Sequence, residues 1–112
     1  MRIKEASYNT IKEELESAIC EYMEENELDF SSDIDVHRAK DDVVNDDWYM
    51  IGYYQCDQWL IKHDVTVWEA IAFVMEYEKE HYGASRVYTN SEDTVNMIAY
   101  IIGQDVDIKK PA

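Results

Sequence analysis

A chain of 112 residues fits one domain and is too short for two ordinary ones. Its hydrophobic fraction of 46% and aromatic fraction of 12% exclude a disordered acidic tail, because such tails lack the apolar surface needed to fold. The 25 acidic residues outnumber the 10 Lys and Arg, and the net charge of −15 disfavours binding to nucleic acid or to an anionic membrane.

The first predicted helix begins at Thr10. The segment Thr10-Ile11-Lys12-Glu13 has the pattern of a capping box, in which a threonine and a glutamate three residues later satisfy free backbone N–H groups. Apolar side chains then recur at helical spacing and predict one buried stripe: Ile11, Leu15, Ala18, Ile19, Tyr22 and Met23.

The second predicted helix follows a loop over residues 28–35. Ser31-Ser32-Asp33 offers its N-terminal cap. The side chains expected to face inward are Val36, Ala39, Val43 and Val44. Residues 48–61 are apolar nearly all round, so periodicity does not separate a buried helix from a strand there. We favour a helix because the neighbouring segments are helical.

Two more helices complete the predicted fold. Thr66-Val67-Trp68-Glu69 is a second capping box, and Gly83 suits the C-terminal end of the helix that follows. The inward stripe expected for that helix is Trp68, Ile71, Ala72, Met75 and Tyr82. Asn90-Ser91-Glu92-Asp93 opens the last helix, and Gly103 lies near its end. Its expected inward residues are Val95, Ile98, Ala99 and Ile102.

These elements predict an all-α protein of four to five helices with an acidic surface. Residues 1–112 form one domain, and we expect residues 1–9 and 107–112 to be frayed tails. The N-terminus lacks the apolar segment of a signal peptide, and no apolar run approaches membrane-spanning length. We therefore expect a cytoplasmic protein.

No motif predicts catalysis, a cofactor or a metal ion. Three scattered glycines cannot form a phosphate-binding loop. Asp33 and Asp35 begin like a calcium loop, but His37 and Arg38 stand where an EF-hand needs an oxygen ligand and glycine. No serine or cysteine nucleophile has a base nearby in the sequence. We therefore expect a protein that is not an enzyme.

The cysteines and the remaining histidines also predict no site. Cys20 and Cys56 are far apart, without metal or redox spacing, so we expect two reduced thiols. His63 and His81 are isolated, which is typical of surface or structural histidines.

The acidic residues are concentrated in one part of the chain. Residues 13–35 contain ten acids and no Lys or Arg, and residues 13–47 have a net charge of −12. On a helix this density corresponds to roughly one charge per 3.5 Å, close to the spacing of about 3.4 Å between phosphates on one DNA strand. An ordinary solvated helix mixes Lys among its Glu, because oppositely charged neighbours stabilise it. The pattern favours a functional acidic face over a merely solvated one.

We expect this acidic face to bind a DNA-binding or otherwise basic protein. Its predicted residues are Glu13, Glu16, Glu21, Glu24, Glu25, Glu27, Asp29, Asp33, Asp35, Asp41, Asp42, Asp46 and Asp47.

Five large aromatic side chains fall within residues 48–59. They cannot all enter one small core if the segment is a helix, and aromatic residues are favoured at protein interfaces. We therefore predict self-association through some of them: Trp48, Tyr49, Tyr53, Tyr54 and Trp59.

In order and character, residues 13–106 resemble the Ocr-type phage antirestriction proteins, which are small acidic helical DNA mimics. The resemblance rests on an acidic first helix that ends in Glu25-Asn26-Glu27-Leu28-Asp29-Phe30, on the segments 36–39 and 42–44, and on the last helix from Ser91. The chain departs from that pattern by ending in Lys109-Lys110 instead of an acidic tail. The resemblance implies a homodimer that occupies the DNA groove of a type I restriction enzyme.

Two functions from different classes remain open at this point. The first is a phage-encoded DNA-mimic inhibitor that blocks a DNA-binding defence protein of the bacterial host, such as a restriction or CRISPR enzyme. The second is an acidic interaction module, of the immunity-protein or adaptor type, that binds a basic protein surface without copying DNA. Mutual exclusion between the protein and duplex DNA on the target would distinguish the first from the second.

Overall fold

The computed structural model describes residues 3–45, 56–88 and 91–109 of the chain. It contains five helices, which are α1 (Glu5–Glu25), α2 (Asp33–Asn45), α3 (Cys56–Lys62), α4 (Val67–Tyr82) and α5 (Ser91–Gln104), and the described residues include no strand. The predicted all-α class is therefore confirmed for this part of the chain. None of these helices combines the length and apolar character needed to cross a membrane.

Helix α1 starts earlier than the sequence predicts. It begins at Glu5, and the hydroxyl of Thr10 donates a hydrogen bond to the carbonyl of Ala6 at 3.0 Å. Thr10 therefore lies inside the helix, and the capping box predicted there is wrong. Ile3 and Ile108 are both buried, so the described parts of the two expected tails pack onto the domain.

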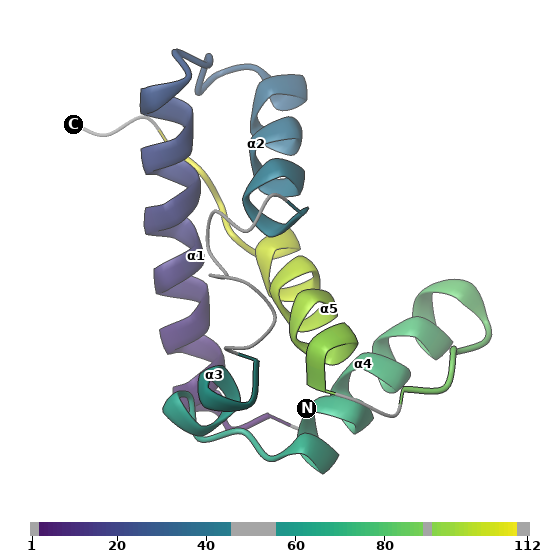
Figure 1. Cartoon of the computed structure of the whole chain (residues 1–112). Coiled ribbons are helices and arrows are strands. Elements are labelled where there is room, and N and C mark those ends of the chain that lie inside the picture. Colours follow the sequence, from purple (N-terminus) through teal and green to yellow (C-terminus); the bar gives the residue numbers. More distant parts are fainter. Residues whose placement is uncertain (1–2, 46–55, 89–90, 110–112) are drawn as a thin grey trace.

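Helices α1 and α2 form an antiparallel hairpin (Figure 1). No basic residue lies in the last turn of α1, and Glu27 just beyond it takes a left-handed conformation with φ 53°. The N–H of Leu28 donates to the carbonyl of Met23 at 2.9 Å, which closes this helix end. The hydroxyl of Ser32 accepts the N–H of Asp35 at 3.3 Å, so the predicted cap of α2 is confirmed.

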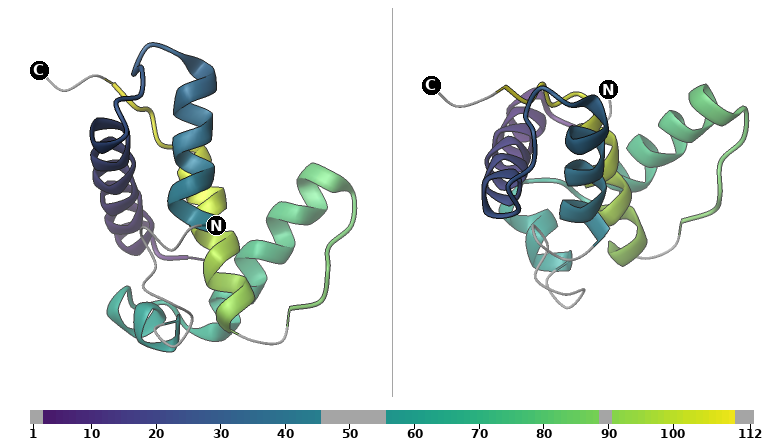
Figure 2. Two further views of the ribbon diagram at one scale, coloured as in Figure 1. Left: turned by 45° about the horizontal axis from the view of Figure 1, so that its top comes forward. Right: turned by 90° about the horizontal axis from the view of Figure 1, so that it is seen from above.

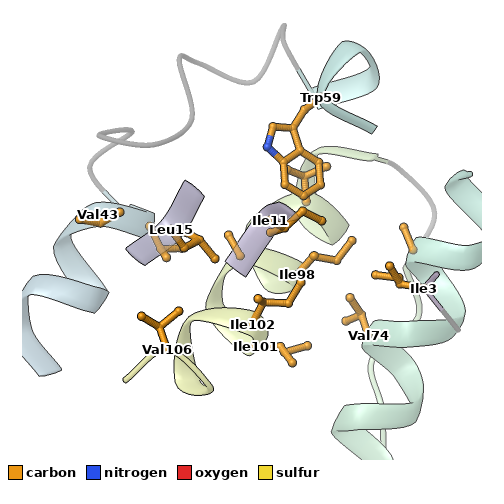
Figure 3. Packing of buried hydrophobic residues seen from close by; sticks show 14 of the residues in the cluster. Ile3, Ile11, Leu15, Val43, Trp59, Val74, Ile98, Ile101, Ile102 and Val106 are labelled. Carbon is orange, nitrogen blue, oxygen red and sulfur yellow. The ribbon is translucent and has the colours of Figure 1, made fainter. Parts of the chain in front are cut away.

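The core is organised around α5, which packs against each of the other four helices. The four residues predicted to face inward from it are all completely buried: Val95, Ile98, Ala99 and Ile102. Figure 3 shows Ile11 and Leu15 of α1, Val43 of α2, Trp59 of α3 and Val74 of α4 around this helix. The apolar side chains of all five helices therefore meet in one core.

The ends of α4 follow local sequence rules. Thr66 Oγ1 accepts the N–H of Glu69 at 3.0 Å, and the Glu69 carboxylate accepts the N–H of Thr66 at 3.0 Å. This is the predicted capping box. At the other end Gly83 has φ 78°, a left-handed conformation that glycine adopts without the steric cost other residues have. Both predicted boundaries of α4 are confirmed.

The rotation of α4 about its axis differs from the prediction. Two of the predicted inward residues, Ile71 and Met75, are half-buried against the core, but Trp68 is 79% exposed and Tyr82 is 63% exposed. The fully buried apolar side chains are instead Ala70 and Val74. Most of the helix surface is apolar, so the spacing of apolar residues alone does not select the inward face. The C-terminal half of α4 also diverges from the other helices (Figure 2), which leaves much of its surface uncovered.

Candidate partner-binding surface

The outer side of α1 carries a row of carboxylates. Glu13, Glu16 and Glu24 are exposed, and they lie opposite the buried positions that recur every four residues along the same helix. The Cys20 thiol is affected by the negative charge of this row. Burial raises the pKa of the thiol, and the negative charges of Glu16 and Glu24 raise it further. Glu16 and Glu24 are therefore close enough to act together on one group.

The turn between α1 and α2 adds a second group of acids and is internally braced. The Asp35 carboxylate accepts the N–H of Asp29 at 2.8 Å. The Asp29 carboxylate in turn accepts the N–H of Ser31 at 2.9 Å and its hydroxyl at 2.7 Å. Two of the predicted acids therefore have structural partners, and their bonds hold the turn that displays Glu27 and Asp33.

The acids further along α2 are also partnered. His37 lies 3.4 Å from Asp41, and Arg38 lies 3.7 Å from Asp42. The hydroxyl of Tyr22 donates to Asp42 at 2.6 Å and thereby links the two helices of the hairpin. Both aspartates are only half exposed. They contribute negative potential, but they are less open to a partner than the carboxylates of α1.

The remaining predicted acids form what we name the acidic surface. Its seven members are exposed, and no Lys or Arg in the described part of the chain forms an ion pair with any of them. They are Glu13, Glu16, Glu21, Glu24, Glu25, Glu27 and Asp33. Asp46 and Asp47, which the sequence also predicts, lie outside the described residues.

Of the five aromatic residues predicted to mediate self-association, the structure describes one. Trp59 is only 8% exposed and packs in the core of the single chain, so this one of the five aromatic residues does enter the core. Trp48, Tyr49, Tyr53 and Tyr54 lie outside the described residues. Exposed apolar side chains on α3 and α4 include Ile61, at 77%, and Trp68, at 79%.

Nothing in the described residues resembles a metal centre. No group of three or more His, Cys, Asp or Glu side chains converges within residues 3–45, 56–88 and 91–109. Cys20 and Cys56 are both free thiols. His63, which directly follows α3, is buried between a backbone carbonyl and Glu14, which is a structural arrangement.

The fold and surface define a small helical domain with an acidic hairpin. Comparison of the chain with protein-family models, with curated proteins and with solved structures gives no match. Functional inference therefore depends on the geometry of the chain itself.

Proposed function

We propose that this protein is a DNA-mimic inhibitor, encoded by a phage or mobile element, that blocks a DNA-binding defence protein in the bacterial cytoplasm. The observation that carries the proposal is the acidic surface, seven exposed carboxylates with which no Lys or Arg of the described residues forms an ion pair. In the proposed mechanism these carboxylates take the places of phosphates against the Lys and Arg of the target's DNA groove. The protein then competes with DNA and needs no catalytic group.

The spacing of the carboxylates supports this reading. Five members of the acidic surface lie on α1 between Glu13 and Glu25, a length of about 18 Å. That is about one carboxylate per 4 Å, close to the value of about 3.4 Å between phosphates along one DNA strand. A basic groove that neutralises a DNA backbone would meet a similar linear charge density on this helix.

The rigidity of the display also supports it. The carboxylates are carried by a helix whose opposite face is fully buried, and by a turn braced by Asp29 and Asp35. A surface that is already ordered loses little conformational entropy on binding, so more of its electrostatic attraction appears as affinity. A merely solubilising charge would need no such order.

The proposal is tested by competition. The protein is immobilised, its target is captured from a bacterial lysate by elution with salt, and the purified target is then incubated with duplex DNA. Mimicry requires that the protein and the duplex exclude each other. A ternary complex, with DNA still bound, would reject mimicry and favour the acidic interaction module.

Matched variants identify the surface responsible. The test variant replaces four members of the acidic surface: Glu13→Gln, Glu16→Gln, Glu21→Gln and Glu24→Gln. The control removes four exposed acids elsewhere and so has the same net charge: Glu5→Gln, Asp57→Asn, Asp93→Asn and Asp107→Asn. We expect the test variant to lose target binding and the control to keep most of it. Equal losses would show that total charge acts, without a defined surface.

A further inference from the structure

A cleft with a different composition lies between α4 and α5. Its volume is about 390 Å³, and six of its lining residues carry the argument. Three are aromatic and three are acidic: Tyr8, Phe73, Tyr77, Glu76, Glu80 and Asp105. The lining comes from residues 73–81 of α4, from the end of α5 and the residue after it, and from Tyr8 of α1. The C-terminal half of α4 diverges from the other helices (Figure 2). No residue of the cleft belongs to the acidic surface.

The aromatic rings of the cleft are held in place by their neighbours. Tyr8 and Phe73 meet edge to face, with 6.5 Å between ring centroids, and Tyr77 stacks on His81 at 3.9 Å. The Tyr8 hydroxyl donates a hydrogen bond to the Asp105 carboxylate. Burial and this bond raise the pKa of Tyr8 well above its usual range, so the hydroxyl remains a hydrogen-bond donor to Asp105. All three rings are half-buried, which leaves part of each accessible.

The charge of the cleft selects the kind of ligand. Three carboxylates line it, and no Lys or Arg is among its lining residues. An anion is therefore repelled. Aromatic faces attract cations, and carboxylates bind a guanidinium through paired, charge-assisted hydrogen bonds. A planar guanidinium can use both interactions at once, stacking on a ring while it donates to an acid.

We propose that this cleft receives an arginine side chain of the protein partner. The inference rests on the proposed function only in taking its partner to be a basic protein. It adds a second, more specific contact through residues that are not part of the acidic surface. The acidic surface then supplies long-range attraction to the partner, and the cleft supplies a site with a defined shape and chemistry.

The test uses two short peptides of identical sequence that carry either one arginine or one citrulline, its uncharged analogue of the same shape. Each is titrated into the isotopically labelled protein, and the ring resonances of Tyr8, Phe73 and Tyr77 are followed by NMR. We expect the arginine peptide to shift these resonances in a saturable way and the citrulline peptide to leave them unchanged. Equal shifts with both peptides, or shifts confined to the residues of the acidic surface, would overturn the proposal.

Variants separate the two interactions. Phe73→Leu removes a ring without changing the charge, and we expect the dissociation constant to rise by about 2–5-fold, the size of a cation–π contact at an exposed site. Glu80→Gln removes one exposed carboxylate without disturbing the core and should also weaken binding. Glu16→Gln removes the same charge from the acidic surface and should leave binding in the cleft almost unchanged. An equal effect of Glu16→Gln and Glu80→Gln would exclude a defined site.

Two further comparisons isolate the source of the guanidinium and the role of the cleft. N-acetyl-arginine methylamide binding as tightly as the peptide would show that the cleft takes free guanidinium compounds, and it would overturn the assignment to a protein side chain. If the protein excludes DNA from its target but its cleft does not bind the arginine peptide, this inference alone is refuted. If the cleft binds the peptide but the protein, its target and DNA form a ternary complex, the proposed mimicry alone is refuted.

Discussion

The Nε2 atom of His63 lies 2.6 Å from the Oε1 atom of Glu14, although the two residues are 49 positions apart in the sequence. The other ring nitrogen, Nδ1, lies 2.7 Å from the carbonyl oxygen of Trp59. The His63 side chain is 1% exposed and that of Glu14 is 31% exposed. Each ring nitrogen therefore faces an oxygen acceptor, and this contact fastens α3 to the middle of α1.

Loss of this contact should destabilise the fold. Glu14→Ala would leave a ring nitrogen of a buried histidine without its partner, which typically costs about 1–3 kcal/mol. Glu13→Ala changes the adjacent, exposed glutamate and should alter the free energy of unfolding by less than about 0.5 kcal/mol. Urea unfolding followed by circular dichroism gives both values. Similar values for the two variants would show that the contact contributes little.

The two threonines in capping-box patterns should behave differently. Thr66→Ala removes a side chain that caps α4, and we expect a loss of about 1 kcal/mol in unfolding free energy. Thr10→Ala acts inside α1, where alanine is the better helix former, so stability should stay the same or rise slightly. Thermal unfolding of both variants makes the comparison. A larger loss for Thr10→Ala would contradict the helix start at Glu5.

The two described tryptophans on α3 and α4 make a matched pair of equal size. Trp59 is 8% exposed and Trp68 is 79% exposed. Trp59→Ala should therefore cost about 3–5 kcal/mol through lost packing and the cavity left behind. Trp68→Ala should change the free energy of unfolding by no more than about 0.5 kcal/mol. If Trp68 proved the costlier position, the observed rotation of α4 would be wrong.

A buried carboxylate on α4 should make stability depend on pH. Burial alone would raise the pKa of Glu78, but hydrogen bonds from Tyr88 and the backbone N–H of Arg86, together with the charge of Arg86, lower it below its usual range. A carboxylate with a lowered pKa stabilises the fold fully above its unfolded pKa of about 4.3. That contribution disappears as the pH falls through the lower pKa of the folded state.

The corresponding variant should flatten this pH dependence. Glu78→Gln keeps the shape of the side chain but removes its charge, so it should be less stable than the parent at pH 7 and should lose less stability below about pH 4.3. Glu80→Gln, two residues along and exposed, serves as the control and should follow the parent curve. Denaturant midpoints measured from pH 7 to pH 2 test this. Parallel curves for Glu78→Gln and the parent would contradict the assignment.

Features that depend on near neighbours in the sequence were the predictable ones. The cap at Thr66 needs only Glu69, and the left-handed turn at Gly83 needs only glycine, so both could be predicted from a few residues. Thr10 begins the same four-residue pattern but does not cap a helix. The same pattern occurs inside a helix when the hydroxyl bonds to the carbonyl of Ala6, and the pattern alone does not distinguish the two cases.

Features that depend on distant parts of the chain were not predicted. The inward face of α4 could not be chosen because apolar residues cover most of that helix. The cleft on α4 and α5 depends on Tyr8 meeting Asp105, 97 residues away. The exposed carboxylates of α1 were predicted because the helical period places them opposite its apolar stripe. Asp41 and Asp42 each pair with a residue four positions earlier, His37 and Arg38. This spacing on a helix could have predicted both pairs, whereas net charge and composition do not show them.

The end of α1 has one further consequence. The aligned peptide dipoles of a helix place roughly half a negative charge at its C-terminus, which is why basic side chains are favoured there. This helix has none in its last turn and instead carries Glu21, Glu24 and Glu25 near that end. The backbone and the side chains therefore place negative charge in the same region, and a cation bound there would relieve their repulsion. Binding of a basic surface there would steady the final turns of the very helix that it contacts.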